Sequence, residues 1–260
     1  MPEKRNRSFA LQTLRDPIIV LLKLSHRGSY EMRKIIRTKI MYFKDRRDAG
    51  RLLAQLLAKY KDEDVVVYAL PRGGVVLAEE IANLLNAPLD LVLAHKIGHP
   101  HQPEYAIAAI SESGNIIGNP QELQPLGDAW LETEKKLQMD EIKRKRLSYL
   151  KGKKEIPVKG KIAIIVDDGI ATGLTMQAGI IELKDRHPKK IIAAVPVSPR
   201  ITADMIRMMV DELVTVIIPD DSKFLGSVGA YYDKFGQVED SEVIEILDNR
   251  QHGTNSKNRP

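Results

Sequence analysis

The stretch that decides the fold reads KIAIIVDDGIATGLT and covers residues 161–175. An apolar run leads into two adjacent carboxylates, and a loop of small and hydroxyl-bearing residues follows. In open α/β sheets, ligands bind beyond the carboxyl ends of the strands. The stretch therefore predicts a buried strand over 162–166 that delivers Asp167 and Asp168 to a binding site, followed by a loop that opens a helix.

The loop after these two aspartates has the composition of a phosphate-binding turn. Glycine lets the backbone approach an anion closely, and the free N–H groups at a helix N-terminus favour a phosphate dianion. The two threonines of the loop add hydroxyl donors. The residues expected to contact the phosphate are Gly169, Ala171, Thr172, Gly173, Leu174 and Thr175.

Asp167 and Asp168 are repelled by phosphate, so their partners should be hydrogen-bond donors. Two neighbouring hydroxyl groups suit a carboxylate pair, and a sugar with both a phosphate and a diol meets both demands. The loop has no lysine and no Gly-Lys-Ser/Thr ending, so it is not a Walker A motif, and the dinucleotide fingerprint is also missing. The simpler interpretation is a strand that ends in two surface aspartates, followed by a helix capped by Thr172.

The rest of the chain predicts an α/β protein. Apolar runs bounded by turn residues alternate with segments whose apolar residues recur at helical spacing. Runs that are apolar throughout are typical of a parallel sheet with helices on both faces. Two stretches differ: 98–118 predicts a long mobile loop leading into a hairpin, and 128–150 predicts a highly charged helix. Strands are expected at 65–70, 89–94, 162–166, 191–197 and 213–218, and further helices at 46–60, 75–85, 174–186 and 200–210.

Composition narrows the class of protein. The chain has 260 residues, 43% of them hydrophobic and 29% charged, as in a folded soluble protein with one main core. It has no cysteine, which excludes disulfides, thiolate catalysis and cysteine-ligated metals and fits the cytoplasm. No apolar run near the N-terminus is long enough to span a bilayer. Residues 1–40 hold ten Lys/Arg against three Asp/Glu, which suits nucleic acid or an anionic membrane surface, although a solvated extension is favoured.

Residues 164–175 resemble the phosphoribosyl-pyrophosphate signature of type I phosphoribosyltransferases. The similarity runs from about residue 42 to residue 247 and is strongest to a bacterial and archaeal group of "predicted phosphoribosyltransferases". It implies that family's fold, with ribose hydroxyls bound by Asp167 and Asp168 and the 5-phosphate bound by 171–175. The segments that carry the resemblance are 43–50, 70–74, 166–173 and 194–198.

The sequence Pro71-Arg72-Gly73-Gly74 resembles the family's pyrophosphate loop, which often contains a cis peptide bond. The two glycines leave backbone amides accessible beside a strand end, and a guanidinium binds pyrophosphate through paired hydrogen bonds. Arg72, Gly73 and Gly74 are therefore expected at the pyrophosphate. The alternative is an ordinary strand-to-helix turn with a surface arginine.

By order along the chain, residues 95–105 correspond to the family's flexible catalytic loop. The resemblance implies that Lys96 neutralises the pyrophosphate and that Glu104 positions the loop or a metal-bound water. Three histidines of this segment are less certain in role. His99 and His101 are candidate donors to the leaving group, but an exposed position is favoured and they are too isolated for a metal site, and His95 replaces the group's arginine.

The acceptor site of this family is a variable hood, and segment 224–235 loosely resembles the hood of purine-salvage enzymes. Its aromatic rings could stack on a planar base. The alternative is that these rings only pack the end of the chain against the sheet. The residues expected at the acceptor are Phe224, Tyr231, Tyr232, Asp233 and Phe235.

The implied reaction is displacement of pyrophosphate from phosphoribosyl pyrophosphate by a nitrogen base, with Asp167, Asp168, Lys96 and Arg72 as the catalytic residues. Magnesium is the implied cofactor. Because Mg²⁺ usually keeps waters and takes one or two carboxylates, no dedicated cage is expected, and the two aspartates are its candidate ligands. The alternative is a non-catalytic phosphoribosyl-binding regulator that binds RNA through the basic arm, although nucleic acid is not favoured.

The expected domain organisation follows from these segments. Residues 1–41 form a basic extension, 42–250 the phosphoribosyltransferase-like domain and 251–260 a disordered tail. Within the domain, a helical insertion is expected over about 119–157 and the hood over about 219–240. A homo-oligomer is left open.

Overall fold

The computed structural model describes residues 43–255, with side chains described as far as Arg250. The expected basic extension over 1–41 and the last part of the expected tail, 256–260, lie outside the described residues. The final helix, α7, ends at Asn255, within the segment that we expected to form the tail. The helical hydrogen bonding runs on beyond Ile246 and Leu247, the last residues of α7 in the core.

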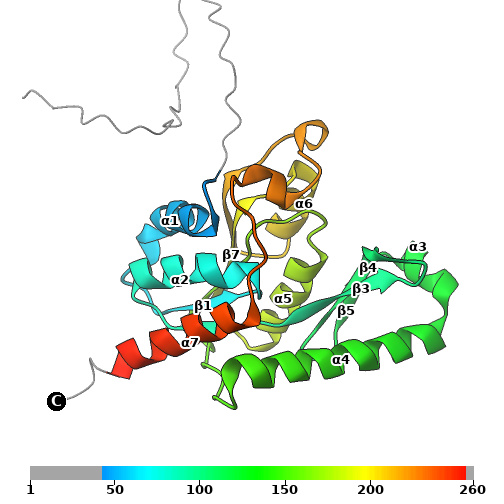
Figure 1. Cartoon of the computed structure of the whole chain (residues 1–260), viewed down its shortest axis with the longest axis horizontal. Helices are drawn as coiled ribbons and strands as arrows, with labels where there is room; N and C mark the ends of the chain where they lie inside the picture. Colours follow the sequence, from blue (N-terminus) through cyan, green and yellow to red (C-terminus); the bar gives the residue numbers. More distant parts are fainter. Residues whose placement is uncertain (1–42, 256–260) are drawn as a thin grey trace, which may run out of the picture. The chain divides into compact units, whose positions relative to one another are not determined.

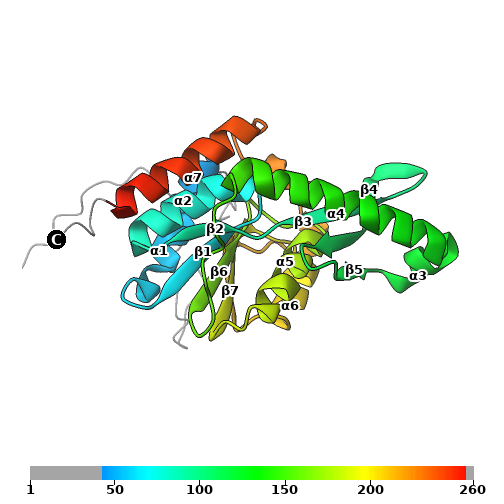
Figure 2. The same ribbon diagram turned by 90° about the horizontal axis from the view of Figure 1, so that it is seen from below.

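A five-stranded parallel sheet lies at the centre (Figures 1 and 2). Its strand order is β2-β1-β6-β7-β8. Its register places Ala69, the last residue of β1, beside Val166, the last residue of β6. The segments that follow these two strands therefore start at the same edge of the sheet. The strands are β1 (Val65–Ala69), β2 (Leu89–Leu91), β6 (Ile162–Val166), β7 (Lys190–Val197) and β8 (Glu212–Ile217).

Helices cover both faces of this sheet. Along β6, Ile162, Ile164 and Val166 belong to the core shared with α1, α2 and α7, whereas Ala163 and Ile165 belong to the core shared with α5 and α6. The expected α/β class, a parallel sheet covered on both faces, is confirmed. No helix within 43–255 is long and apolar enough to cross a membrane. The helices are α1 (Arg46–Leu56), α2 (Gly73–Leu85), α5 (Leu174–Asp185), α6 (Arg200–Arg207) and α7 (Asp240–Asn255).

A second, antiparallel sheet extends away from the first beside the long helix α4 (Figures 1 and 2). The loop expected at the start of 98–118 is wrong, because β3 and β4 pair there, whereas the hairpin expected after it is present as β4 and β5. Gly98, Pro100 and Pro103 are the residues that suggested a loop. Gly98 lies at a shift in the β3–β4 register, and the two prolines lie at or near the turn. Gly98 is needed there because a Cβ would lie 2.2 Å from the carbonyl oxygen of Pro103. The elements are β3 (Ala94–His99), β4 (Gln102–Ser111), β5 (Ile116–Gly118), α3 (Pro120–Leu123) and α4 (Asp128–Leu150), and α4 has the expected bounds. Short 3₁₀ helices are η1 (Ala58–Tyr60), η2 (Gln124–Leu126), η3 (Asp221–Lys223) and η4 (Val228–Tyr231).

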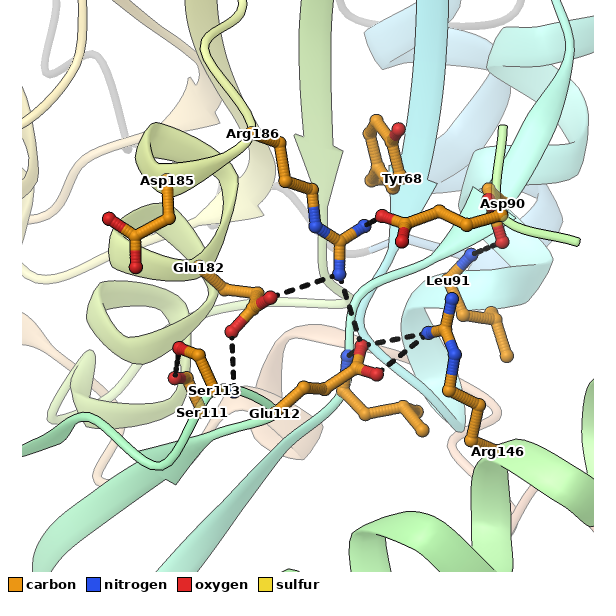
Figure 3. A network of polar contacts seen from close by, with 12 residues as sticks. Tyr68, Asp90, Leu91, Ser111, Glu112, Ser113, Arg146, Glu182, Asp185 and Arg186 are labelled. Carbon is orange, nitrogen blue, oxygen red and sulfur yellow. Dashed lines mark hydrogen bonds and ion pairs between the residues drawn. The ribbon is translucent and has the colours of Figure 1, made fainter. Parts of the chain in front are cut away.

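A buried ionic network connects the antiparallel sheet to α4 and to the end of α5 (Figure 3). Glu112, directly after β4, accepts hydrogen bonds from Arg146 of α4 at 2.9 and 2.8 Å and from the backbone N–H of Leu93 at 2.8 Å. Arg186 donates to Glu112 at 3.5 Å and to Glu182 at 3.2 Å. Burial raises the pKa of Glu112, and the charge of Arg146 opposes that rise. The network therefore holds the base of the β3–β4 hairpin against the main sheet.

Candidate active site

The loop between β6 and α5 offers hydrogen-bond donors to one cavity. Gly173 is the N-cap of α5 and has φ 80°, a left-handed conformation that favours glycine. The first N–H groups of a helix, here from Leu174 onward, have no acceptor within the helix. The buried hydroxyl oxygen of Thr175 has no hydrogen-bond partner in the described part of the chain. Thr202 of α6 donates to the carbonyl of Ala171 at 2.7 Å and fixes the loop, so the loop suits an anion.

Asp167 and Asp168 reach the same cavity from the end of β6. One carboxylate oxygen of Asp167 accepts the backbone N–H of Asp168 at 2.8 Å. Burial raises the pKa of both carboxyls, and the charge of Asp168 raises that of Asp167 further. Only 16% of the Asp168 side chain is exposed. The two acids are therefore not simple surface charges.

Arg46, in the first turn of α1, neutralises Asp168. Its Nε donates to Oδ2 of Asp168 at 2.7 Å, and Nη1 donates to the carbonyl of Gly236 at 2.6 Å. Its guanidinium also lies 3.8 Å from the centroid of the Phe235 ring. Arg46 is absent from the residues expected at the site, because a basic residue at the start of an amphipathic helix is usually solvated. The one signal is its place within 43–50, a segment that carries the family resemblance.

The turn at 71–74 connects β1 to α2 and presents Arg72. The peptide bond between Pro71 and Arg72 is cis, in agreement with the implied resemblance. The Arg72 side chain is 37% exposed, and its Nη1 lies 3.6 Å from Asp240 at the start of α7. Such an ion pair in partial contact with water is weak, so Arg72 remains available to an anion.

The same turn packs directly against the acid pair. A Cβ on Gly73 would lie 1.9 Å from Oδ2 of Asp168, and a Cβ on Gly74 would lie 2.6 Å from the carbonyl oxygen of Val166. Atoms of these kinds do not approach so closely, so a side chain at Gly73 would displace the Asp168 carboxylate and one at Gly74 would require the backbone to shift. Two segments far apart in the sequence are therefore in contact at the edge of the sheet.

These segments line one cavity of about 360 Å³ at the carboxyl ends of β1 and β6. Arg46, Val228 and Phe235 line it as well. The expected residues that the structure brings together at this cavity are Arg72, Gly73, Lys96, Asp167, Asp168, Gly169, Ala171, Thr172, Gly173, Leu174 and Thr175.

The sequence matches the family model described as "Phosphoribosyl transferase domain" over residues 43–233. This chain belongs to the phosphoribosyltransferase family. Its central sheet and covering helices have the expected type I phosphoribosyltransferase fold.

Relatives of known sequence or structure agree with this membership. The crystal structure of TT1426 from Thermus thermophilus is 38% identical in sequence and superposes with a TM-score of 0.67. The alignment covers 80% of this chain and 98% of the TT1426 chain. Proteins named "Putative phosphoribosyl transferase" in two strains of Mycobacterium tuberculosis are 39% identical over 208 residues, 79% of this chain. This chain spans only 46% of their length, about half.

The segment over 95–105, which we expected to be a flexible catalytic loop, lies in the β3–β4 hairpin. Lys96, on β3, lines the cavity that contains the acid pair. Glu104 instead lines a neighbouring cavity. His99 and His101 lie beside the hairpin turn with ring centroids 5.6 Å apart, and neither lines the cavity that contains the acid pair. Of these expected residues, Lys96 therefore shares a cavity with the acid pair.

The hood differs from expectation at its two tyrosines. Tyr231 and Tyr232 are only 2% and 7% exposed and belong to the core, so their rings offer no free stacking face. Tyr232 also donates its hydroxyl to the carbonyl of Asp168 at 2.6 Å. Phe224 stacks on Tyr231 with centroids 5.6 Å apart, and Asp233 is exposed. Packing against the sheet therefore accounts for the tyrosines, and only Phe235 of the expected aromatic residues lines the cavity.

The residues present fit a magnesium ion that is held mainly by a substrate. Within 43–250, no group of three or more His, Asp or Glu side chains is placed to hold a metal. The cavity does contain the two carboxylates of Asp167 and Asp168. Mg²⁺ characteristically takes one or two protein carboxylates together with substrate phosphates and waters. The two carboxylates of this cavity agree with that coordination.

The substitution Gly73→Ala should displace the Asp168 carboxylate, because the new Cβ and Oδ2 cannot both keep their places. We expect the affinity for phosphoribosyl pyrophosphate, measured by calorimetry, to fall about tenfold or more, as for the loss of a charge-assisted hydrogen bond. Gly236→Ala is the control, because an added Cβ there meets nothing within 4 Å. Unchanged affinity in Gly73→Ala would contradict the proposed contact.

Asp167→Asn should stabilise the free protein near neutral pH. Because folding raises the pKa of Asp167, stability decreases as pH rises from the ordinary aspartate pKa of about 3.9 toward the raised value. Asparagine avoids the buried charge and still accepts the N–H of Asp168. We expect the free energy of unfolding in urea to rise by about 1 kcal/mol or more at pH 7 and to change little at pH 4. The exposed Asp62→Asn is the control; an equal gain at both pH values would contradict the explanation.

Proposed function

We propose that this protein transfers the phosphoribosyl group of phosphoribosyl pyrophosphate to a nitrogen base and releases pyrophosphate. One observation carries the proposal: a donor-rich loop, a carboxylate pair and an arginine-bearing turn line a single cavity. A phosphate, a diol and a pyrophosphate each find a complementary group there. Membership of the phosphoribosyltransferase family supports the same class of reaction.

Each part of the donor has a partner in this proposal. The 5-phosphate accepts hydrogen bonds from the loop over 171–175, and the ribose hydroxyls donate to Asp167 and Asp168. Arg72 and Lys96 donate to the pyrophosphate. The acceptor nitrogen forms a bond to C1 while the bond from C1 to the pyrophosphate oxygen breaks. The electron pair of that bond leaves with pyrophosphate, and the acceptor nitrogen gives its proton to solvent.

The charges around the cavity favour this displacement. Positive charge develops on the sugar as the bond to pyrophosphate weakens, and the carboxylates of Asp167 and Asp168 stabilise it. Lys96 and Arg72 stabilise the negative charge on the leaving group. Such fixed groups act most strongly where water is excluded. Neutralisation of the pyrophosphate charge is the chemistry that Mg²⁺ supplies when bound.

We place the acceptor base against Val228 and Phe235. These are the apolar side chains of the hood that line the cavity. Arg46 lies over the Phe235 ring, and Tyr232 packs against the same ring with centroids 4.7 Å apart, so a planar ligand would contact only the part of the ring that lines the cavity. The chemistry of the lining suits a flat nitrogen heterocycle, and the buried tyrosines behind it hold the hood in position.

The direct test is acceptor-dependent release of pyrophosphate. The full chain is incubated with phosphoribosyl pyrophosphate, MgCl₂ and a panel of purines, pyrimidines and other amines. We expect release with one class of acceptor, and we expect loss of both release and donor binding in the Asp167→Asn, Asp168→Asn double variant. No release with any acceptor, together with salt-dependent RNA binding that disappears when residues 1–41 are deleted, would favour the regulatory alternative.

Arg46→Gln should shift the pH dependence of donor binding. The charge of Arg46 lowers the pKa of Asp168 against the effect of burial, so its loss should let Asp168 take up a proton at higher pH. We expect the acid limb of the donor affinity, measured by calorimetry between pH 4 and pH 8, to move to higher pH. Arg47→Gln is the control, since Arg47 is paired with Glu79 and Glu80 and does not line the cavity. An identical pH profile in Arg46→Gln would contradict this role.

A further inference from the structure

A second, larger cavity adjoins the proposed donor cavity on the side of α4. Its volume is about 600 Å³, against about 360 Å³ for the donor cavity. Arg72 and Lys96 line both cavities. The far wall is formed by α4, β3 and Leu93, the residue before β3. Ile142 and Leu93 are apolar lining residues, and Lys145 is a cation. The proposed transfer uses none of this far wall.

Lys145 is held in place by a chain of hydrogen bonds along α4. Its Nζ lies 3.1 Å from Nε2 of His95, and Nδ1 of His95 contacts Oε1 of Gln138. Gln138 in turn donates its side-chain N–H to Glu134 at 2.6 Å, which fixes the orientation of its amide. Burial lowers the pKa of His95, and the charge of Lys145 acts in the same direction. A neutral His95 that donates through Nδ1 and accepts from Lys145 through Nε2 satisfies every contact.

The second cavity has an excess of positive charge. Three cations line it, Arg72, Lys96 and Lys145, while Glu104 is its carboxylate. Lys96 forms no ion pair with another described residue, and the carboxylate nearest to Lys145 is Glu141 at 3.7 Å. Only 27% of the Lys145 side chain is exposed. Arg72 has one long ion pair as well, to Asp240 at 3.6 Å. Three neighbouring cations whose ion pairs with described residues are absent or this long form a site that an anion would stabilise.

We propose that this second cavity binds a phosphate-bearing ligand separate from the donor, with Lys145 as its distinguishing contact. Arg72 and Lys96 face both cavities, so the ligand competes with the donor's pyrophosphate for the same two cations. By linkage, each ligand then weakens the other to the same degree. The cavity would make donor binding sensitive to a second phosphate compound. This inference needs only anion binding and not the transfer reaction.

The test titrates inorganic phosphate into the full chain saturated with ribose 5-phosphate, which fills the loop over 171–175 but leaves Arg72 and Lys96 unoccupied. We expect phosphate to bind, and Lys145→Gln to weaken that binding about tenfold or more. Lys143→Gln is the matched control, because it removes the same charge from an exposed position of the same helix. Phosphoribosyl pyrophosphate in place of ribose 5-phosphate should weaken phosphate binding in the wild-type protein.

Several outcomes would overturn the proposal. Phosphate could fail to bind the saturated wild-type protein, or Lys143→Gln could weaken its binding as much as Lys145→Gln. If Lys145→Gln weakens phosphoribosyl pyrophosphate as strongly as inorganic phosphate, the cavity is only the outer part of the pyrophosphate site. A further test uses the wild-type protein and no variant. The NMR signals of the His95 ring nitrogens should shift as phosphate is added, and unchanged signals would also contradict the proposal.

These outcomes are distinct from a failure of the proposed function. If the protein is not a transferase of this kind, ribose 5-phosphate does not bind or no acceptor releases pyrophosphate. Inorganic phosphate binding that depends on Lys145 would survive that result. Conversely, normal acceptor-dependent release with no Lys145-dependent phosphate binding removes only the second site.

Discussion

The parallel pairing of β1 with β6 is the constraint on which the site depends. Because Ala69 and Val166 are in register, the turn after β1 and the acid pair after β6 emerge side by side. Gly73 and Gly74 then allow contact closer than any side chain would permit. A shift of one residue in this pairing would separate the groups proposed for pyrophosphate from those proposed for ribose. The geometry of the cavity is therefore a property of the sheet and not of its loops alone.

We expect the site to lower the stability of the free protein. Two adjacent carboxylates are held where burial raises the pKa of both, and charges buried this way are unfavourable unless they are paired. Arg46 supplies a partner for Asp168 and at the same time contacts Gly236 and Phe235 of the hood. The Arg46 guanidinium thus pairs with Asp168 and also holds the hood beside it. Strain or destabilisation of this kind is common where a protein must recognise a ligand.

The sequence predicts those parts of the structure that depend on local pattern. The strand over 162–166, the helix over 128–150 and the loop between Asp167 and Thr175 follow from apolar runs, helical spacing and glycine placement. Features that depend on tertiary contacts are not visible in this way. Arg46 looks like a solvated helix residue until α1 is packed against the hood, and Tyr231 looks like a stacking ring until its burial is known. The β3–β4 hairpin was hidden because Gly98 and its neighbouring prolines have the composition of a loop.

The position of the β3–β4 hairpin also determines where the cations of the site lie. Lys96 belongs to β3, whose pairing with β4 ends beside Glu112, and Glu112 is held by Arg146 of α4 and by Arg186 after α5 (Figure 3). Lys145 is the neighbour of Arg146 on the same helix. Since one ionic network anchors both the strand that carries Lys96 and the helix that carries Lys145, the two cations keep a defined separation. The same network therefore supports walls of both cavities, which also share Arg72 and Lys96.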